Sequence, residues 1–552
     1  MSHWGYFGSR ESTPDLYEQL LLPAQVVAID VETPTLDDRR VLGLSISTSP
    51  FDSFWFPCET EINDKIPWQL LSNPAVKKVF HNAMFDLGVI PEIGPIDVSN
   101  IYDTNVLAHL LGYLRTSLTE LSLHIDREAE GAKEFMARFG VKRMDLAPIN
   151  DVGKKCCNDS QVTLALYYEW KDRLPQTLQG EYWDKEMQAI PILIKMGKRG
   201  IKIDHTVRQE WEEKLSTSTE YYKQLAENEG FMISSNQQVA YVLAKRGNFL
   251  PFTKLRRKTD GSWAKRNLCV GVEVLELLDD PLAAIVLDWR KDNKLLTTYF
   301  RPLKGQDRFT THYNLDAAVG RVSSSDRNIQ NIPDPARPML LPDSGLFTIG
   351  DFSQEHLRIL AHWSQDRAML DIYDNGMEDG DIHKYTAKQL NMERKPAKTV
   401  NYNIIYSLFT RACAKSLSQT TKIRDLRRCS EIADNWARTF PQAADWIRGA
   451  QEYGLRTGWS MPTMFGRSIK LPDIEEEGED GVRRKACNYP ILGSDGEVIK
   501  RALIMTQHLN PVITVHDEIT YEGDVSQCIP EEIEFISGFH VPFDVKVSTH
   551  WE

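Results

Sequence analysis

Two apolar strands that each end in an acidic residue place the strongest constraint on the fold of this chain. The segment LFTIGDFSQEHLRILAHWSQD (346–366) predicts a strand that ends at Asp351 and is followed by a helix. The segment PVITVHDEITYEG (511–523) predicts a β-hairpin with Asp517 and Glu518 at its turn. Two strands that present one Asp each could hold two Mg²⁺ ions about 4 Å apart, as in-line phosphoryl transfer requires. Taken alone, either acid is typical of an ordinary turn.

Between these strands lies RKPAKTVNYNIIYS, which has helical spacing. Lys398, Tyr402 and Tyr406 recur every four residues and therefore share one face of the predicted helix. Pro396 suits the first turn of that helix, which leaves Arg394 just before its N-terminus. A face with cations and aromatic rings could hold a triphosphate and stack against a base, although such a stripe alone is more often ordinary surface or core.

A second set of acids lies in the N-terminal third, where short strands and helices alternate. Asp30 and Glu32 end the apolar strand QVVAIDVET (25–33), and their spacing puts both side chains on one face. FHNAMFDLGV places Asn82 and Asp86 where a strand runs into a helix, and CCNDSQVTLAL predicts Asp159 at the start of another helix. Carboxylates that converge without His or Cys suit Mg²⁺ or Mn²⁺.

Residues 24–175 resemble the proofreading 3′–5′ exonuclease domain of the DEDD superfamily, through Asp30-x-Glu32, Asn82…Asp86 and Asp159. The resemblance implies a ribonuclease H-like α/β fold in which Asp30, Glu32, Asp86 and Asp159 are catalytic and bind two metal ions. Polymerase-linked members carry Tyr four residues before the last Asp, whereas this chain has Lys155. Without the hydroxyl that orients the attacking water, we expect a present but impaired exonuclease, with Lys155 turned away from the ions or deprotonated.

The C-terminal segments together resemble the family A DNA polymerases, the class of bacterial DNA polymerase I and its phage relatives. Motif A matches at 351–358, motif B at 394–406 and motif C at 515–518. GRVSSSDRNIQNIP (320–333) matches the template-primer motif, and SSNQQVAYVLAKRG (234–247) resembles the thumb. The resemblance covers the chain from about residue 180 onward and implies a right hand of thumb, palm and fingers that adds deoxynucleotides to a primer 3′ end.

The same resemblance assigns roles to individual residues of the polymerase. Asp351 and Asp517 would bind two Mg²⁺ ions, with Mn²⁺ as an alternative, and Glu518 would lie beside them. Arg394, Lys398, Tyr402, Tyr406, His356 and Gln354 would bind the incoming nucleotide, and Lys398 would also be catalytic. Contacts with primer and template would come from Arg321, Gln330, Asn331, Arg484, Asn488 and His516.

Two positions depart from the family pattern. The sugar-selecting Glu, five residues after the first catalytic Asp, is replaced by His356, although Glu355 adjoins it. The minor-groove Gln is replaced by Leu492, which cannot hydrogen-bond a base edge. The family Glu is held by an aromatic hydroxyl on the fingers helix, and we expect His356 not to be fixed in the same way and to loosen sugar selection.

Charge and composition limit the other possibilities. Lys and Arg number 65 against 78 Asp and Glu, which excludes a protein coated with basic charge but not a local basic groove. Basic residues cluster at 245–266 and 290–308, where they form either a solvated face or a phosphate-contacting surface. The eight cysteines lack a CxxC pair, and no run approaches the roughly 18 apolar residues of a membrane span. We therefore expect a cytoplasmic protein, in the bacterial host if phage-encoded, without a membrane partner.

The predicted domains are an exonuclease-like domain over 1–178 and a polymerase domain over 179–552. Within the latter we place the thumb at about 185–310, the palm at about 311–375 and 485–552, and the fingers at about 376–484. Only 29 residues precede Asp30, which leaves no counterpart of the 5′-nuclease domain of polymerase I and suggests a phage or other mobile replicon.

Two other interpretations remain open from the sequence. A single-subunit RNA polymerase shares the catalytic Asp, Lys and Tyr, but the exonuclease-like segment and Glu518 argue against it. A nucleic-acid-binding protein with inactive sites would not need the complete set of acids. The predicted partners are primer-template DNA and dNTPs, and the sequence does not identify a processivity factor.

Overall fold

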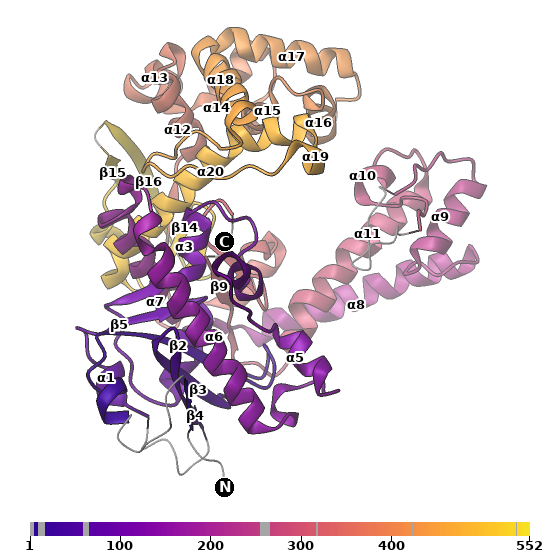
Figure 1. The fold of residues 1–552 in the computed structure, drawn as a ribbon. Coiled ribbons are helices and arrows are strands. Elements are labelled where there is room, and N and C mark those ends of the chain that lie inside the picture. The colour runs from indigo at the N-terminus through magenta and orange to yellow at the C-terminus, as the bar shows by residue number, and fades with distance from the viewer. Residues whose placement is uncertain are drawn as a thin grey trace.

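The computed structural model describes residues 5–8, 17–58, 66–253, 265–315, 318–421, 423–536 and 538–552. Figure 1 shows a body that contains two β-sheets, a group of helices above it, and a helical arm that leaves the body to one side. The mixed α/β architecture predicted from the sequence is confirmed. Within the described ranges, no helix is both long and apolar enough to cross a bilayer.

The N-terminal sheet has six strands in the order β1-β4-β3-β2-β5-β6. β2 runs parallel to β5 and β5 parallel to β6, whereas β3, β4 and β1 continue the sheet with antiparallel pairs. Parallel strands end at a common edge of the sheet, and Asp30 and Glu32 lie at that edge on β2. The strands are β1 (Gly5–Gly8), β2 (Val26–Glu32), β3 (Gly43–Ser49), β4 (Asp52–Pro57), β5 (Lys77–Phe80) and β6 (Ile101–Asp103).

The helix α6 (Ile149–Trp170) packs against β2, β3 and β4 and carries Asp159 in its middle. The prediction that Asp159 starts a helix is therefore wrong, because the helix begins directly after Pro148. The run before Asp159 is polar and contains glycine, so the first turns of this helix were not predicted. Gly153 in that run is required for packing, since a Cβ there would lie 2.7 Å from the Trp55 ring. The other helices of this domain are α1 (Trp68–Leu71), α2 (Ala83–Val89), α3 (Thr104–Leu110), α4 (Leu118–Ser122) and α5 (Ala132–Arg138).

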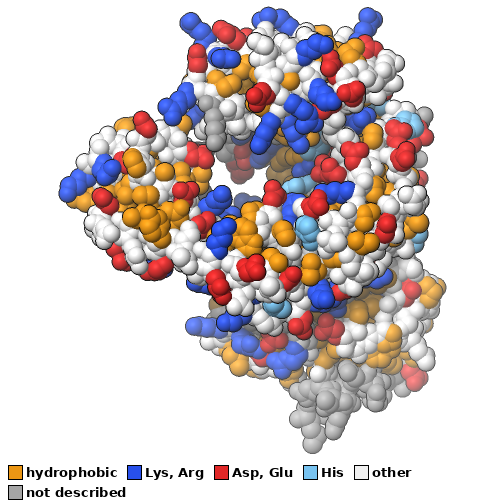
Figure 2. All heavy atoms as spheres, turned by 180° about the vertical axis from the view of Figure 1, so that it is seen from behind, with side chains coloured by type: hydrophobic (Ala, Val, Ile, Leu, Met, Phe, Trp, Pro, Cys, Tyr) orange, Lys and Arg blue, Asp and Glu red, His pale blue; other side chains and the backbone are white. Residues whose placement is uncertain are grey.

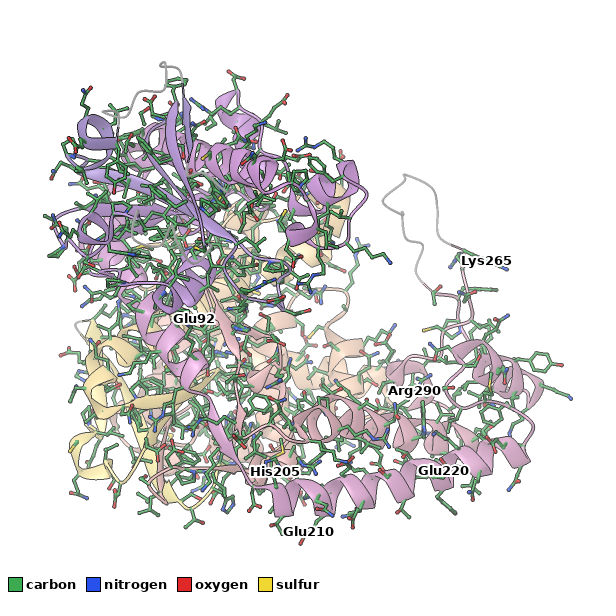
Figure 3. The ribbon with its side chains drawn as sticks, turned by 90° about the horizontal axis from the view of Figure 1, so that it is seen from below. Glu92, His205, Glu210, Glu220, Lys265 and Arg290 are labelled. Carbon is green, nitrogen blue, oxygen red and sulfur yellow. The ribbon has the colours of Figure 1, made fainter. Side chains whose placement is uncertain are left out.

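The arm consists of helices around a small core of its own. Figure 3 shows the long helix α8 leaving the body at His205 and passing Glu210 and Glu220, with Arg290 on the neighbouring helix α11. Its buried side chains include Leu243, Val286 and Trp289. The arm helices are α8 (His205–Asn228), α9 (Asn236–Lys245), α10 (Val272–Leu275) and α11 (Pro281–Leu295).

Several basic residues of the arm are bound to the arm itself. Arg246 Nε lies 3.0 Å from Asp280 Oδ2. Arg290 donates hydrogen bonds to the Val270 carbonyl oxygen at 2.5 Å and to Asn236 Oδ1 at 2.8 Å. These contacts favour a structural role for Arg246 and Arg290 over contact with phosphate. Four further cations of this cluster, Lys254, Arg256, Arg257 and Lys258, lie outside the described residues.

The C-terminal sheet is antiparallel, with five strands in the order β13-β14-β12-β16-β15. Asp351 lies near the end of the central strand β12, opposite Glu518 on β14 and Asp544 on β16. These strands are β12 (Phe347–Phe352), β13 (Pro511–Val515), β14 (Glu518–Glu522), β15 (Glu532–Ile536) and β16 (Phe539–Ser548). Two small sheets join β7 (Ile201–Ile203) to β8 (Arg308–Phe309) and β11 (Leu340–Leu341), and β9 (His312–Asn314) to β10 (Ser323–Ser325).

The helices above this sheet share an apolar core that includes Leu360, Ile404 and Trp436. The helix predicted after Asp351 is α12, and the helix that carries Lys398 is α15, so both helices are confirmed. The prediction that Arg394 lies just before the N-terminus is wrong, because α15 begins at Arg394 and Glu393 is its N-cap. This group consists of α12 (Glu355–Ser364), α13 (Arg367–Asp374), α14 (Ile382–Leu390), α15 (Arg394–Ser407), α16 (Cys413–Thr421), α17 (Leu426–Thr439), α18 (Pro441–Thr457), α19 (Ile474–Glu477) and α20 (Glu479–Thr506).

A buried ion pair joins the helix α7 (Glu181–Arg199), which follows the N-terminal domain, to α20 of the C-terminal part. Lys500 Nζ lies 2.5 Å from both oxygens of Glu186, and the two side chains are 0% and 4% exposed. One turn away, the Tyr182 hydroxyl donates a hydrogen bond of 2.6 Å to Glu497. Lys500 pairs with both oxygens of Glu186, so this polar contact fixes the register of α7 on α20.

We expect Lys500→Met to destabilise the fold strongly, because it leaves the buried Glu186 carboxylate without its partner. The expected loss is about 3–5 kcal/mol of unfolding free energy, measured by chemical denaturation. Lys546→Met is the matched control: its pair with Glu552 is half-exposed, and such pairs contribute about 0–1 kcal/mol. Equal losses for the two variants would show that the buried pair does not hold the junction. Adding Glu186→Gln to Lys500→Met should recover part of the stability.

Candidate active sites

The first site lies where the end of β12 meets the hairpin of β13 and β14. Asp517 lies in the hairpin turn, next to His516, whose φ of 55° is unusual for a residue with a side chain. The backbone N–H of Phe352 donates a hydrogen bond of 3.0 Å to the Asp517 carbonyl oxygen and so holds the turn against β12. The two acids predicted from separate strands, Asp351 and Asp517, are thereby brought side by side.

Repulsion and burial act together on these acids. Burial, together with the Asp517 and Glu518 carboxylates, raises the pKa of Asp351 to about 7. Burial likewise raises the pKa of Asp517, with a further rise from Asp495. The Glu518 carboxylate is already engaged, since it accepts a hydrogen bond of 2.7 Å from the Trp551 indole N–H. Carboxylates that are this difficult to ionise alone favour a bound divalent cation.

The helix α15 presents its predicted face to these acids. Lys398 Nζ lies 6.0 Å from the centre of the Tyr402 ring. The His356 ring of α12 lies edge-on to both tyrosines, with centroid distances of 5.9 Å to Tyr402 and 6.0 Å to Tyr406. Burial raises the pKa of Tyr402, and the Asp517 and Asp351 charges raise it further. The shared face of Lys398, Tyr402 and Tyr406 is confirmed, and it lies next to the acids.

Two other predicted nucleotide-binding residues contact the start of α14. Arg394 Nε lies 2.6 Å from Asp381 Oδ2, and Asp381 also caps α14. Gln354 donates a hydrogen bond to the Gly380 carbonyl oxygen at 3.3 Å and accepts one from the Ile382 backbone N–H at 3.2 Å. These bonds connect the starts of α12, α14 and α15. The roles of Arg394 and Gln354 toward a nucleotide stay predictions.

A chain of hydrogen bonds holds His356 in place. The Tyr406 hydroxyl lies 2.5 Å from His356 Nδ1, and Arg321 Nη2 lies 2.8 Å from His356 Nε2. Asp495 Oδ1 also lies near Nε2, at 3.3 Å, so this ring nitrogen faces both Arg321 and Asp495. Arg321 also donates from Nε to Asp495. The expectation that no aromatic hydroxyl fixes His356 is therefore wrong.

Asp495 and Glu355 belong to the same network and were not identified as site residues from the sequence. Asp495 on α20 and Glu355 on α12 are each 1% exposed. Burial alone would raise the pKa of Asp495, but Arg321 and His356 hold it well below its usual range. Burial and the Asp495 charge raise the pKa of Glu355 well above its usual value. The sequence signal for Asp495 is its helical spacing. Asp495 follows Asn488 by seven residues and therefore lies on the same face of α20.

The second site lies at the end of β2, where the four predicted acids converge. Asp30 and Glu32 come from β2, Asp86 from α2 and Asp159 from α6. Burial raises the pKa of Asp30 well above its usual value, and Asp159 and Glu32 raise it further. Burial and the Asp30 charge likewise raise the pKa of Asp86 well above its usual value.

Asp103, another residue not identified from the sequence, positions Asp86. Its carboxylate accepts hydrogen bonds from the backbone N–H groups of Asn82 at 3.0 Å and Ala83 at 2.7 Å. N–H groups at the start of a helix have no acceptor within the helix. By accepting these two hydrogen bonds, Asp103 fixes the start of α2, the helix that carries Asp86. Asp103 ends a short strand and is the N-cap of α3, a pattern too common to indicate a site by itself.

Lys155 lies between two of these acids. Its Nζ is 2.6 Å from Glu32 Oε1 and 2.6 Å from Asp159 Oδ2, and all three side chains are 8% exposed. Burial alone would lower the pKa of Lys155, but Glu32 and Asp159 raise it well above its usual value. The expectation that Lys155 turns away or loses its proton is therefore wrong for this arrangement. Ligand atoms of Asp30, Glu32 and Cys156 lie within 4.8 Å of one another, which leaves room for one metal ion.

Comparison with known proteins identifies the family. Residues 202–551 match the family model described as DNA polymerase family A. The chain belongs to this family. Residues 9–172 match the model described as 3′-5′ exonuclease, so an exonuclease domain precedes the polymerase domain. The resemblance stated from the motifs is confirmed on both counts.

Similar proteins include two bacterial enzymes named DNA polymerase I. The protein of Chloroflexus aurantiacus is 28% identical over 92% of this chain and 58% of its own length. That of Pseudomonas aeruginosa is 25% identical over 92% of this chain and 60% of its own length. The chain thus spans about three fifths of these relatives. Among solved structures, the POL domain of Pol1 from M. smegmatis in complex with DNA primer-template and dNTP shares the fold, with a TM-score of 0.76, 19% identity and 97% coverage of both chains.

The residues predicted to contact DNA come from three segments that adjoin one another. Arg321 reaches α20 through Asp495, and α20 also carries Arg484 and Asn488 one turn apart. Burial lowers the pKa of His516, and the nearby Arg321 charge lowers it further, which places the hairpin turn beside Arg321. Gln330 and Asn331 follow Arg321 in a short helix, where Gln330 donates a hydrogen bond of 3.0 Å to the Val322 carbonyl oxygen.

The raised pKa of Asp351 predicts a pH-dependent gain in stability for Asp351→Asn in metal-free buffer. The folded-state pKa of about 7 exceeds the unfolded value of about 4, so ionisation destabilises the fold progressively as pH rises through 7. We expect the variant to raise Tm at pH 8 and to have little effect near pH 4, as measured by calorimetry in EDTA. Asp524→Asn is the control, because Ser526 lowers the pKa of that exposed acid. A gain of the same size at both pH values would contradict the assignment.

Proposed function

We propose that this chain is a template-directed DNA polymerase that adds deoxynucleotides to a primer 3′ end, with an associated and weakened 3′–5′ exonuclease. The observation that carries this proposal is the placement of Asp351 and Asp517 side by side, facing Lys398 and Tyr402 of α15. Two acids that face a cation and an aromatic ring of one helix suit the metal-assisted transfer of a nucleotide.

Asp351 and Asp517 supply only hard oxygen ligands, which fit Mg²⁺ and, as an alternative, Mn²⁺. Two ions, when bound there, would neutralise phosphate charge and make the primer 3′-hydroxyl easier to deprotonate. The protein contributes the positions of the ligands, which the Phe352–Asp517 backbone bond fixes, and the ammonium of Lys398, which can hold the triphosphate and stabilise the leaving pyrophosphate. Glu518, held by Trp551, lies beside these ligands.

The surroundings of this site support the roles that the family resemblance implies. Figure 2 shows a hollow between the arm and the rest of the molecule, with Lys and Arg side chains on its rim. A cationic rim suits a DNA backbone even on a chain of net charge −13. We assign nucleotide contacts to Arg394, Lys398, Tyr402, Tyr406, His356 and Gln354, and primer-template contacts to Arg321, Gln330, Asn331, Arg484, Asn488 and His516.

The domain boundaries are part of the proposal. We place the exonuclease domain at 1–178, the thumb at about 185–310, the palm at about 311–375 and 485–552, and the fingers at about 376–484. The arm of α8 to α11 supports the thumb, and the β12–β16 sheet supports the palm. Because the similar proteins are bacterial, we place the chain with DNA in a bacterial cytoplasm, that of the host if a phage encodes it.

Replacing Asp351 or Asp517 by Ala should reduce primer extension at least about a thousandfold, because the lost carboxylate neutralises charge that matters most in the transition state. Binding of primer-template, measured by fluorescence anisotropy, should change little, since DNA affinity comes mainly from cations. Asp524→Ala, which removes an exposed acid outside the site, should extend normally. Extension by the Asp351→Ala variant at the parent rate would refute the proposed metal site, and it would favour the inactive binding protein.

Sugar selection should depend on His356 and Asp495 as a pair. In His356→Glu a new carboxylate would face Asp495, whose Oδ1 lies 3.3 Å from His356 Nε2. Repulsion should then displace the side chain and lower kcat/KM for dNTPs by about tenfold. Adding Asp495→Ala should remove the repulsion, restore kcat/KM and raise discrimination against ribonucleotides above that of the parent.

The measurement is single-nucleotide incorporation of a dNTP and the matching rNTP by the parent, both single variants and the double variant. Glu497→Gln is the control, because Glu497 is a buried acid of the same helix that binds Tyr182 instead. It should leave the dNTP-to-rNTP ratio unchanged. If the effects of the two substitutions on kcat/KM and on the dNTP-to-rNTP ratio are additive, Asp495 does not act through residue 356.

A further inference from the structure

The ammonium of Lys155 lies where acids from two elements would share a cation. Glu32 of β2 and Asp159 of α6 each direct one carboxylate oxygen at Nζ, both at 2.6 Å. In a site for two divalent cations these oxygens would instead be metal ligands. We propose that Lys155 takes the place of one of the two ions, so that the exonuclease site of this chain binds at most one divalent cation.

The fold holds Lys155 in this position. Residues four apart lie on one face of a helix, so Lys155 lies over Asp159, and Glu32 completes the contact from the sheet. Beneath them, Ser45 of β3 donates to the Cys156 carbonyl oxygen at 2.8 Å and lies 2.8 Å from the Ser160 hydroxyl, which fixes α6 on the sheet. Retraction of the ammonium would leave two buried carboxylates without a cation, a costly arrangement.

The neighbouring lysine on the same helix behaves differently. Lys154 is 62% exposed and lies 3.4 Å from Asp151 at the surface. Only Lys155 has turned into the acids, although the two residues are adjacent and chemically identical. The burial of Lys155 therefore follows from its place on the helix and is no general property of lysines on α6.

The charges of the site support one ion rather than two. Asp30, Glu32, Asp86 and Asp159 carry four negative charges when ionised, and Lys155 offsets one of them permanently. One divalent cation offsets two more. A second divalent cation would have to lie beside the ammonium in a buried site, where repulsion between like charges is strong. The remaining ligand atoms fit a single ion, since those of Asp30, Glu32 and Cys156 lie within 4.8 Å of one another.

This arrangement alters the chemistry that the site can perform. An ammonium can neutralise a phosphate and donate hydrogen bonds, but it has no open coordination position for water. It therefore cannot generate a hydroxide, which is the part of the reaction that a metal ion supplies. The inference rests on the proposed function and explains the weakening of the exonuclease by a missing ion in addition to the missing tyrosine hydroxyl.

Counting bound Mn²⁺ tests the proposal without measuring activity. The full chain carrying Asp351→Asn and Asp517→Asn, which removes the polymerase ligands, is titrated with Mn²⁺, and free Mn²⁺ is measured by electron paramagnetic resonance. We expect at most one tightly bound ion in this background and one more after Lys155→Met. Lys154→Met is the matched control and should bind as the background does. Lys155→Gln, which keeps a polar side chain, should also gain an ion and serves where Lys155→Met fails to fold.

Thermal unfolding gives a second measurement on the same proteins. In EDTA, Lys155→Met and Lys155→Gln should have a lower Tm than the background, because the acids lose their fixed cation. Saturating Mn²⁺ should raise the Tm of these variants more than that of the background, since each additional ion that binds only the folded state adds to its stability. Two ions in the background, or no gain in ions and no extra Mn²⁺-induced rise in Tm after either substitution, would overturn the proposal.

These outcomes are separable from those of the proposed function. Primer extension and excision of a single-stranded 3′ end by the unmodified chain test the polymerase and the weakened exonuclease. The number of bound ions depends on neither rate. Rapid excision together with two bound ions would refute both the weakened exonuclease and the replacement of a cation by Lys155. Slow excision with two bound ions would refute only the replacement.

Discussion

Repulsion among buried carboxylates is the constraint on which both sites of this structure depend. Each site gathers acids at strand ends, where burial and mutual repulsion raise their pKa values. Such an arrangement is stable only if positive charge is supplied nearby or the fold elsewhere holds it together. At the first site the acids Asp351 and Asp517 remain open to added cations. At the second site Lys155 supplies one charge permanently.

The network around His356 shows how a buried acid can be useful without binding metal. Asp495 holds Arg321, Arg321 contacts His356, and His356 shares a hydrogen bond with Tyr406, so one carboxylate on α20 positions groups on three other segments. The adjacent Glu355 has a raised pKa, because burial and the Asp495 charge both disfavour its ionised form. The junction between Glu186 and Lys500 lies farther along the same helix. α20 thus transmits the position of the N-terminal domain, through α7, to the polymerase site.

The sequence alone predicted the elements that carry strong local signals. Apolar strands that end in acids located Asp30, Glu32, Asp351 and Asp517, and four-residue spacing located the face of α15. The helix boundary before Asp159 was missed, because its buried positions include Gly and Cys beside Val152 and so form a weak apolar pattern. Contacts such as Asp495 with Arg321, or Lys155 with Glu32, join residues more than a hundred positions apart. No local pattern encodes such pairs, since they depend on how whole elements pack.

The two sites solve the same electrostatic problem in ways that suit different tasks. In the proposed polymerase the first site would take up a cation with each incoming triphosphate, and a fixed charge there would compete with the arriving ion. Among the described residues Lys398 forms no ion pair with Asp351, and its Nζ lies 6.0 Å from the centre of the Tyr402 ring. Lys155, in contrast, contacts its acids directly and is shielded from solvent. Direct pairing stabilises the N-terminal domain without metal, and it does so by occupying the oxygens that hydrolysis would need.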